Sequence, residues 1–159
     1  MQQYTWFYSL KSPLSPEQVA ALEVDFAQFL SKWNTHGTPV DGLITLKYNR
    51  FIIIQSDPKV ARPSGCSIDS LKRAIGEILN AHRLEVVDSA YIFYRDGNDE
   101  IQSTHFSKIP GLVNDGTLRP ETIVFDHSLD QSDDLSKWET AMENTWLNRY
   151  FPIKQKQES

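Results

Sequence analysis

The feature that most constrains the fold is a pair of strand-like segments between two amphipathic helical segments. Residues 42–48 and 51–56 are rich in β-branched and aromatic side chains, which favour strands. Asn49-Arg50 lies between them and predicts a two-residue hairpin turn, because Asn tolerates a positive φ. If Tyr48 pairs with Phe51, one face of the hairpin is apolar and suits a core. The opposite face is then half apolar, with Thr45, Lys47, Ile52 and Ile54.

The two flanking segments each carry a helix start and one apolar stripe. Ser15, Pro16 and Gln18 predict a capped first turn in which Ser15 and Gln18 form a capping box. We expect this helix to end near Asn34, and its stripe consists of Val19, Leu22, Phe26, Phe29 and Trp33. Residues 64–70 open the second helix, whose stripe consists of Ile68, Leu71, Ile75, Ile78 and His82.

The remaining segments complete an α+β pattern. Alternation over Tyr4–Ser9 predicts the first strand. After the second helix we expect a strand over 86–95, a short strand over 100–104, a helical turn over 107–113, a strand over 122–126 and a final helix from a cap at 132–134 to about Tyr150. The first six elements follow the β-α-β-β-α-β order of a ferredoxin-like sandwich, which two short strands and a C-terminal helix extend. We predict one domain over residues 1–153 and a frayed tail over 154–159.

Composition narrows the class of protein. A chain of 159 residues is long enough for one domain with an ordinary hydrophobic core. Its net charge of -5 lacks the basic footprint of a nucleic-acid-binding domain. The longest uninterrupted apolar run, Phe51 to Ile54, is far too short to span a membrane, and the first ten residues do not resemble a signal peptide. We therefore expect a cytoplasmic protein with neither a nucleic-acid partner nor a membrane span.

Cysteine and histidine usage gives no sign of a metal or a cofactor. Cys66 is the only cysteine, so the chain cannot form an internal disulfide, which suits a reducing compartment. No helix offers a pair of histidine ligands three or four residues apart, because the four histidines are His36, His82, His105 and His127. We expect neither a metal site nor a bound cofactor.

The densest cluster of chemistry-bearing residues lies over residues 64–70, at the start of the second helix. A helix N-terminus presents unpaired amides and the positive end of the helix dipole, and both attract anions. Gly65 lets the backbone approach a ligand and the serines supply hydroxyl groups. The candidate ligand-binding residues are therefore Ser64, Gly65, Ser67 and Ser70. Arg50, at the hairpin tip, could clamp an acidic ligand from outside this cluster.

Cys66 offers a second interpretation of the same segment. The N-terminus of a helix stabilises a thiolate, and Asp69 in the same turn opposes that effect. With His36 as the base, Cys66 could act as a nucleophile. The candidate catalytic residues are therefore Cys66, His36 and Asp69.

Both features also have purely structural interpretations. If Ser67 is the helix cap, Cys66 and Leu71 occupy the two positions of a hydrophobic staple, and Cys66 is a small buried apolar residue. His36-Gly37 is in that case only the stop of the first helix. The sequence leaves these alternatives open.

Two phosphate-binding motifs are excluded. A phosphatase loop needs a cysteine and an arginine spaced so that both face one phosphate, and Arg73 lies one position too far from Cys66. The P-loop pattern G-x-x-x-x-G-K-[ST] does not occur, so the chain has no conventional cradle for ATP phosphates.

Four motifs together resemble a known family. They are Trp33-x-x-His36-Gly37, Asn49-Arg50-Phe51, Ser64-Gly65-Cys66-Ser67-Ile68-Asp69 and Trp146-x-x-Arg149-Tyr150-Phe151. Over most of its length the chain resembles a family of short, uncharacterised bacterial proteins often named "ABC transporter ATPase". The missing P-loop argues against the ATP hydrolysis that this family name implies. The resemblance implies only that the four motifs are worth testing together.

Three functions follow from these observations. The first is the binding of an anionic small molecule, or of a protein partner, at the start of the second helix. The second is a thiol-dependent enzyme with Cys66 as nucleophile and His36 as base. The third is a structural module that forms homo-oligomers through the half-apolar face that carries Ile52 and Ile54.

Overall fold

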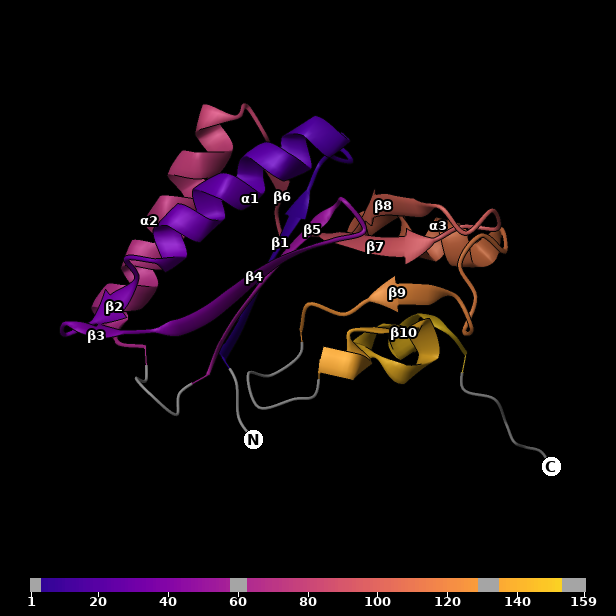
Figure 1. Cartoon of the computed structure of the whole chain (residues 1–159). Helices are drawn as coiled ribbons and strands as arrows, with labels where there is room; N and C mark the ends of the chain where they lie inside the picture. The colour runs from indigo at the N-terminus through magenta and orange to yellow at the C-terminus, as the bar shows by residue number, and fades with distance from the viewer. Residues whose placement is uncertain (1–3, 58–62, 129–134, 153–159) are drawn as a thin grey trace. The chain divides into compact units, whose positions relative to one another are not determined.

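The computed structural model describes residues 4–57, 63–128 and 135–152 as an α+β protein (Figure 1). The described residues form three α-helices and antiparallel sheets of four, two and four strands. The chain divides into two compact units, residues 1–87 and residues 88–159, and each unit is described by itself. This division does not test the prediction of one domain. The expected frayed tail, residues 154–159, lies outside the described residues.

The first unit is built on a four-stranded sheet with the strand order β4-β5-β1-β6. All three strand pairings in this sheet are antiparallel. Its strands are β1 (Tyr4–Leu10), β4 (Asp41–Lys47), β5 (Phe51–Asp57) and β6 (Val86–Val87). The first predicted strand, Tyr4–Ser9, is confirmed as β1. A short hairpin of β2 (Asn34–Thr35) and β3 (Thr38–Pro39) precedes β4.

Both long helices begin with capping boxes, and the first box is the predicted one. In α1 (Pro16–Leu30) the amide of Gln18 donates to Ser15 Oγ over 3.1 Å, and the Ser15 amide donates back to Gln18 Oε1 over 2.8 Å. In α2 (Gly65–Ala81) the cap is Ser64. The helix α1 ends at Leu30, earlier than the predicted Asn34, and Trp33 lies in the segment that follows it.

The hairpin between β4 and β5 is confirmed, but its predicted register is wrong by one residue. Lys47 pairs with Phe51, and Tyr48 does not. Tyr48 and Asn49 both adopt the left-handed backbone conformation, with φ of 55° and 54°, so the turn contains three residues and not two. A shift of one residue exchanges the faces of a strand. The face toward the helices therefore carries Ile44, Leu46, Ile52 and Ile54.

The core of the first unit lies between this sheet face and the two long helices, which Figure 1 draws together on one side of the strands. Its buried side chains come from the sheet, from both helices and from the segments that join them. They are Leu10, Leu14, Leu22, Phe26, Trp33, Val40, Ile52, Ile54, Leu71, Ile75 and Leu79. Near the C-terminal end of α2, His82 Nε2 and Asp25 Oδ2 lie 2.7 Å apart and link α2 to α1.

The second unit has its own four-stranded antiparallel sheet, with the order β10-β9-β7-β8. Its strands are β7 (Tyr91–Arg95), β8 (Ile101–His105), β9 (Ile123–Phe125) and β10 (Glu139–Ala141). The short helix α3 (Ile109–Asn114) follows β8. Its core consists of Tyr94, Ile109, Leu118, Val124, Met142 and Leu147. The strand predicted over 86–95 is divided, because Asp88 Oδ1 accepts the Ala90 amide in a turn between β6 and β7.

The predicted C-terminal helix is wrong. Its expected cap, residues 132–134, lies outside the described residues, and the rest is strand β10 with short 3₁₀ helices over Leu135–Lys137, Met142–Asn144 and Trp146–Tyr150. Thr145 ends one 3₁₀ helix and caps the next, because its Oγ1 donates to the Met142 carbonyl and accepts the Leu147 amide. Trp138, Met142 and Leu147 are buried, but they come from separate short elements, and Trp146 is exposed.

Candidate functional site

A cavity of about 360 Å³ lies at the N-terminal end of α2, within the first unit. The α2 side of the cavity is formed by the first turns of that helix. The opposite side is formed by the end of α1 and the β2–β3 hairpin, which Figure 1 draws beside the start of α2. The described lining residues are Phe29, Lys32, Trp33, Asn34, Thr35, His36, Ser64, Cys66, Ser67 and Ser70.

The first turn of α2 is held by a reciprocal pair of serines. The Ser67 amide donates to Ser64 Oγ over 3.2 Å, and the Ser64 amide donates to Ser67 Oγ over 2.7 Å. Ser64 is therefore the cap, which overturns the staple interpretation built on Ser67. Cys66 occupies the second helical position and its thiol side chain is exposed, whereas a staple would bury it.

Trp33 fixes the two walls of the cavity against each other. The indole Nε1 donates to the carbonyl oxygen of Ser67 over 2.9 Å in a buried hydrogen bond. The ring is only 2% exposed and packs against Trp6 and Phe29, with ring centroids 6.1 Å and 5.6 Å away. The cavity therefore has a rigid aromatic base, because Trp33 is held both by packing and by its polar end.

The β2–β3 hairpin brings His36 to the cavity. His36 and Gly37 form its turn, with φ of 51° and 85°, and the Asn34 side chain accepts the Gly37 amide over 3.2 Å. Two consecutive residues with positive φ are typical of tight hairpin turns. The interpretation of His36-Gly37 as the stop of α1 is therefore wrong, because α1 has already ended at Leu30.

Five of the described lining residues were not among the sequence-based candidates, namely Phe29, Lys32, Trp33, Asn34 and Thr35, and two of these bear directly on the chemistry of the cavity. Lys32 follows α1, is exposed, and forms no ion pair with any residue in the described part of the chain. Thr35 is only 7% exposed, and its Oγ1 is buried with no hydrogen-bond partner among the described residues. A sequence pattern does not reveal either residue, because Lys32 lies in the short segment after α1 and Thr35 lies in a two-residue strand.

Some predicted candidates meet at this cavity and others do not. Ser64, Ser67, Ser70, Cys66 and His36 all line it. Gly65 and Asp69 lie on α2 but are not among the lining residues. Cys66 and His36 share the cavity, yet no hydrogen bond joins them among the described residues.

Arg50 lies elsewhere in the first unit. It is buried at 8% exposure, and its guanidinium donates to the carbonyl oxygens of Leu10 and Lys11 over 2.8 Å and 2.9 Å. These bonds hold the end of β1 against the β4–β5 turn. Burial lowers the pKa of Arg50 from its usual value. In this position the side chain supports the sheet and does not line the cavity.

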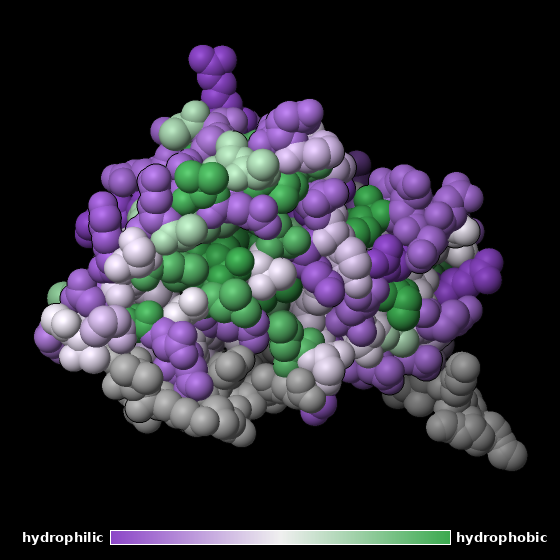
Figure 2. Space-filling model, in the orientation of Figure 1, coloured by the Kyte–Doolittle hydropathy of each residue, from purple (hydrophilic) through white to green (hydrophobic). Residues whose placement is uncertain are grey.

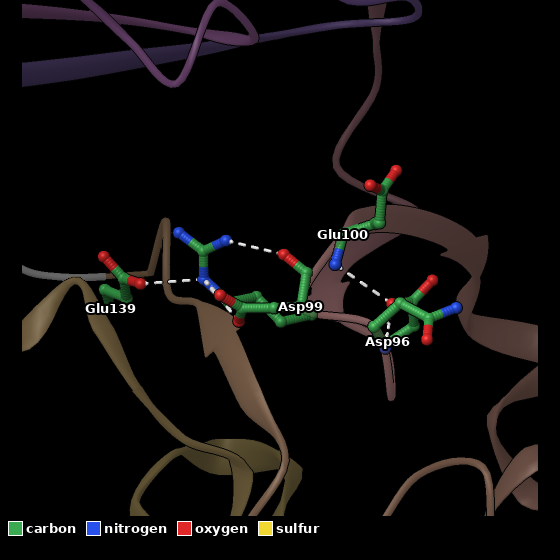
Figure 3. Close-up of polar contacts among 6 residues, drawn as sticks. Asp96, Asp99, Glu100 and Glu139 are labelled. Carbon is green, nitrogen blue, oxygen red and sulfur yellow. Dashed lines mark hydrogen bonds and ion pairs between the residues drawn. The ribbon is translucent and has the colours of Figure 1, made fainter.

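The second unit contains another cavity, of about 580 Å³, next to a charged cluster at the β7–β8 turn (Figure 3). Arg95 Nε donates to Glu139 Oε2 over 3.0 Å, and Arg95 also donates to the carbonyl oxygen of Asp99 over 3.1 Å. The Asp96 carboxylate accepts hydrogen bonds from Gln102, Glu100 and Asn98, and these bonds lower the pKa of Asp96. These hydrogen bonds and the Arg95–Glu139 ion pair stabilise the turn.

Comparison of the chain with protein-family models, with curated proteins and with solved structures finds no match in any of the three. Among the described residues there is no group of three or more His, Cys, Asp or Glu side chains placed to hold a metal ion. No helix in the described ranges is both long enough and apolar enough to cross a bilayer. The functional argument therefore rests on the geometry of the α2 cavity.

Proposed function

We propose that this protein binds a small anionic molecule in the cavity at the N-terminus of α2. The observation that carries the proposal is the combination of charges around one cavity. The start of a helix, the ammonium group of Lys32 and three serine hydroxyls surround it, and none of the described lining residues is acidic. A helix N-terminus and a nearby cation both favour a bound anion.

Free donors at the start of α2 support the proposal. The capping box uses the Ser67 amide, and the Ile68 amide donates to the Ser64 carbonyl. No described residue accepts a hydrogen bond from the amides of Gly65 or Cys66. These two amides are the ones that a carboxylate or phosphate would use, together with the hydroxyl of Ser70.

The size and the walls of the cavity indicate the kind of anion. A volume of about 360 Å³ is at the small end of the range for ligand pockets. Phe29 and Trp33 make one wall apolar. We therefore propose a ligand that joins one carboxylate or phosphate group to a compact apolar body.

The binding proposal is tested by thermal unfolding in the presence of phenyl phosphate, benzoate, inorganic phosphate and neutral benzyl alcohol. A ligand that binds only the folded chain raises the melting temperature, because it stabilises that state by RT ln(1 + L/Kd), where L is the free ligand concentration. We expect phenyl phosphate and benzoate to stabilise the protein and benzyl alcohol to have no effect. Lys32→Ala should remove that stabilisation, whereas Lys72→Ala, a matched exposed lysine on α2, should retain it. Equal stabilisation of both variants would contradict the proposal.

Thiol chemistry is a second candidate function, because the exposed Cys66 shares the cavity with His36. A ligand bound in the cavity would then lie next to a nucleophile. The discriminating measurement is the rate of Cys66 alkylation in the native chain as a function of pH, compared with the His36→Ala variant. A slower reaction in the variant at neutral pH favours an enzyme. Identical pH profiles, with anion binding retained in Cys66→Ser, favour a binding protein.

We also infer that residues 4–87 have a ferredoxin-like arrangement. The inference is supported by the order β1, α1, β4, β5, α2, β6, with the β2–β3 hairpin as an addition, and by the sheet order β4-β5-β1-β6. Both long helices pack on one face of that sheet, as the split βαβ design requires. We further propose that the chain is related to the family of short bacterial proteins that the four sequence motifs resemble.

A further inference from the structure

The longest sheet edge in the described residues is strand β4. In the first unit the two edges are β4, with seven residues, and β6, with two. In the second unit the edges are β10, with three residues, and β8, with five. Proteins usually shorten, bend or block an exposed edge, because its free backbone groups can pair with another chain. The two-residue β6 obeys that rule and β4 does not.

The strand β4 has neither a bulge nor a proline. Seven consecutive residues, from Asp41 to Lys47, pair with β5 without a break. No described residue outside β5 makes a backbone hydrogen bond to residues 41–46. Every second residue of an edge strand directs its N–H and C=O away from its neighbour, so these groups are available to a further strand.

Apolar side chains accompany this free backbone edge. Leu43 is 58% exposed, and it has the highest exposure among the large hydrophobic residues of the described chain. Ile44 and Leu46 are partly buried against the core. Figure 2 shows apolar surface over the part of the first unit where Figure 1 draws α1 and β4. An edge of this composition favours pairing with a further strand.

The sequence of β4 is complementary to itself when reversed. In the antiparallel register that pairs all seven residues, Asp41 lies opposite Lys47 of a second copy, Leu43 lies opposite Thr45, and Ile44 lies opposite its own counterpart. Asp41 and Lys47 are both exposed, and neither forms an ion pair with another described residue. Opposite charges that face each other across two strands stabilise the pairing.

We propose that β4 is a homodimer interface, in which two copies pair their β4 strands antiparallel about a twofold axis at Ile44. The two four-stranded sheets then form one continuous sheet of eight strands. The twofold axis makes the contact isologous, so the Asp41–Lys47 ion pair occurs at both ends of the shared ladder. Other registers leave residues of β4 unpaired and separate these charges. This interface does not depend on the ligand cavity at α2.

The arrangement of charges can be tested by sedimentation equilibrium, which measures the dissociation constant of the dimer. Protein concentrations of roughly 1–300 µM cover the dissociation constants expected of a small interface. Wild type should form a dimer of two 18.3 kDa chains. Asp41→Lys and Lys47→Asp should each raise the dissociation constant by about tenfold at low salt, since both ends become repulsive. A mixture of the two variants should associate again, because each lysine then faces an aspartate. A parallel in-register pairing already places like charges opposite each other in wild type, so it would not weaken the single variants relative to wild type.

A second variant and a control complete the test. Leu43→Lys places a third charge on the edge and should give a monomer with unchanged stability, because residue 43 is exposed. Glu77→Lys, on the exposed surface of α2, makes the same change in net charge as Asp41→Lys and should leave the dimer intact. A wild-type chain that remains monomeric throughout overturns the proposal. So does a dimer that is equally stable in Leu43→Lys, or variants that do not associate when mixed.

Discussion

The indole Nε1 of Trp33 donates a buried hydrogen bond to the carbonyl oxygen of Ser67 over 2.9 Å, and this bond joins the segment after α1 to the first turn of α2. The two residues are 34 positions apart in sequence. Ser67 also takes part in the capping box through its amide and its hydroxyl. One residue pair thus connects helix capping, core packing and the cavity wall, and it is the first place to test the site.

Replacing Trp33 by Phe should destabilise the first unit and weaken anion binding. The variant retains an aromatic ring but leaves the Ser67 carbonyl without its indole donor, a loss of about 1–3 kcal/mol. Urea unfolding measures this loss, and the thermal shift with phenyl phosphate measures binding. Trp146→Phe is the control, because Trp146 is 45% exposed and its replacement should change stability by less than about 0.5 kcal/mol. A Trp33→Phe variant as stable as wild type would refute the structural role.

Gly42→Ala and Gly76→Ala should change stability in opposite directions. A Cβ at residue 42 would lie 2.9 Å from Trp33 Cζ3 and 3.0 Å from Leu30 Cδ2, in a core that cannot easily yield, so a loss of about 1–3 kcal/mol is expected. At residue 76, within α2, a Cβ meets nothing within 4 Å. Alanine there should stabilise the helix by roughly 0.5–1 kcal/mol. Urea titration measures the unfolding free energies of the two variants. Equal values would show that the close approach at Gly42 is absent.

Ser64 allows the cap to be separated from the anion site. Ser64→Ala should cost about 1 kcal/mol of stability, because the Ser67 amide loses its acceptor. Ser64→Asp should keep the stability near that of wild type, since aspartate is also a good N-cap. It nevertheless adds a negative charge to the cavity wall, so phenyl phosphate should no longer raise the melting temperature. If Ser64→Asp retains full stabilisation by phenyl phosphate, the ligand does not bind at this helix start.

Acid should destabilise the folded chain through His127. Burial lowers the pKa of His127 to about 4, although the nearby Asp126 acts in the opposite direction. The imidazole stacks on Trp138, with the ring centroids 6.1 Å apart. Between about pH 6.5 and pH 4 the unfolded chain takes up a proton at this position and the folded chain does not. The unfolding free energy should therefore fall by roughly 3 kcal/mol as the pH falls through this window, and no further below it.

The contribution of His127 to the pH dependence is the difference between the unfolding free energies of wild type and a variant without this imidazole. His127→Gln removes the titrating group, so its unfolding free energy should depend less on pH between 6.5 and 4 than that of wild type. The proton resonances of the His127 ring should titrate near pH 4 in the folded chain. Parallel pH profiles for the two proteins, or a ring that titrates near 6.5, would show that the imidazole is not shielded from water.

The local structure of this chain could be predicted from its sequence, whereas its long-range arrangement could not. The capping box at Ser15 and Gln18 was predicted correctly because its partners are three residues apart. The start of α2 within residues 64–70 was also predicted, but the staple interpretation placed the cap at Ser67, whereas the cap is Ser64 and Cys66 is exposed. The cluster at residues 64–70 pointed to a real cavity, yet Lys32 and Thr35 were missed. The β2–β3 hairpin places Thr35 there, and its short strands have no pattern of their own.

Long-range contacts also explain two of the differences between the predicted and the observed fold. Residues 135–150 carry apolar side chains at helical spacing, but the pairing of Glu139–Ala141 with β9 requires a strand there. Backbone pairing between distant segments does not show in the periodic spacing of apolar residues along the sequence. The β4–β5 register goes with a three-residue turn in which Arg50 is buried and donates to Leu10, 40 residues away, and no local pattern reveals that contact.

The sequence alone thus determined the elements whose stability is local: the strand β1, the capped helices α1 and α2, and the existence of the β4–β5 hairpin. Capping, periodicity and turn preference act within a few residues and leave a direct pattern. The tertiary structure alone decided the register of that hairpin, the exposure of Cys66, the residues around the α2 cavity and the free edge at β4. Each of these depends on buried contacts between distant segments, whose free energy exceeds the local preferences that a sequence displays.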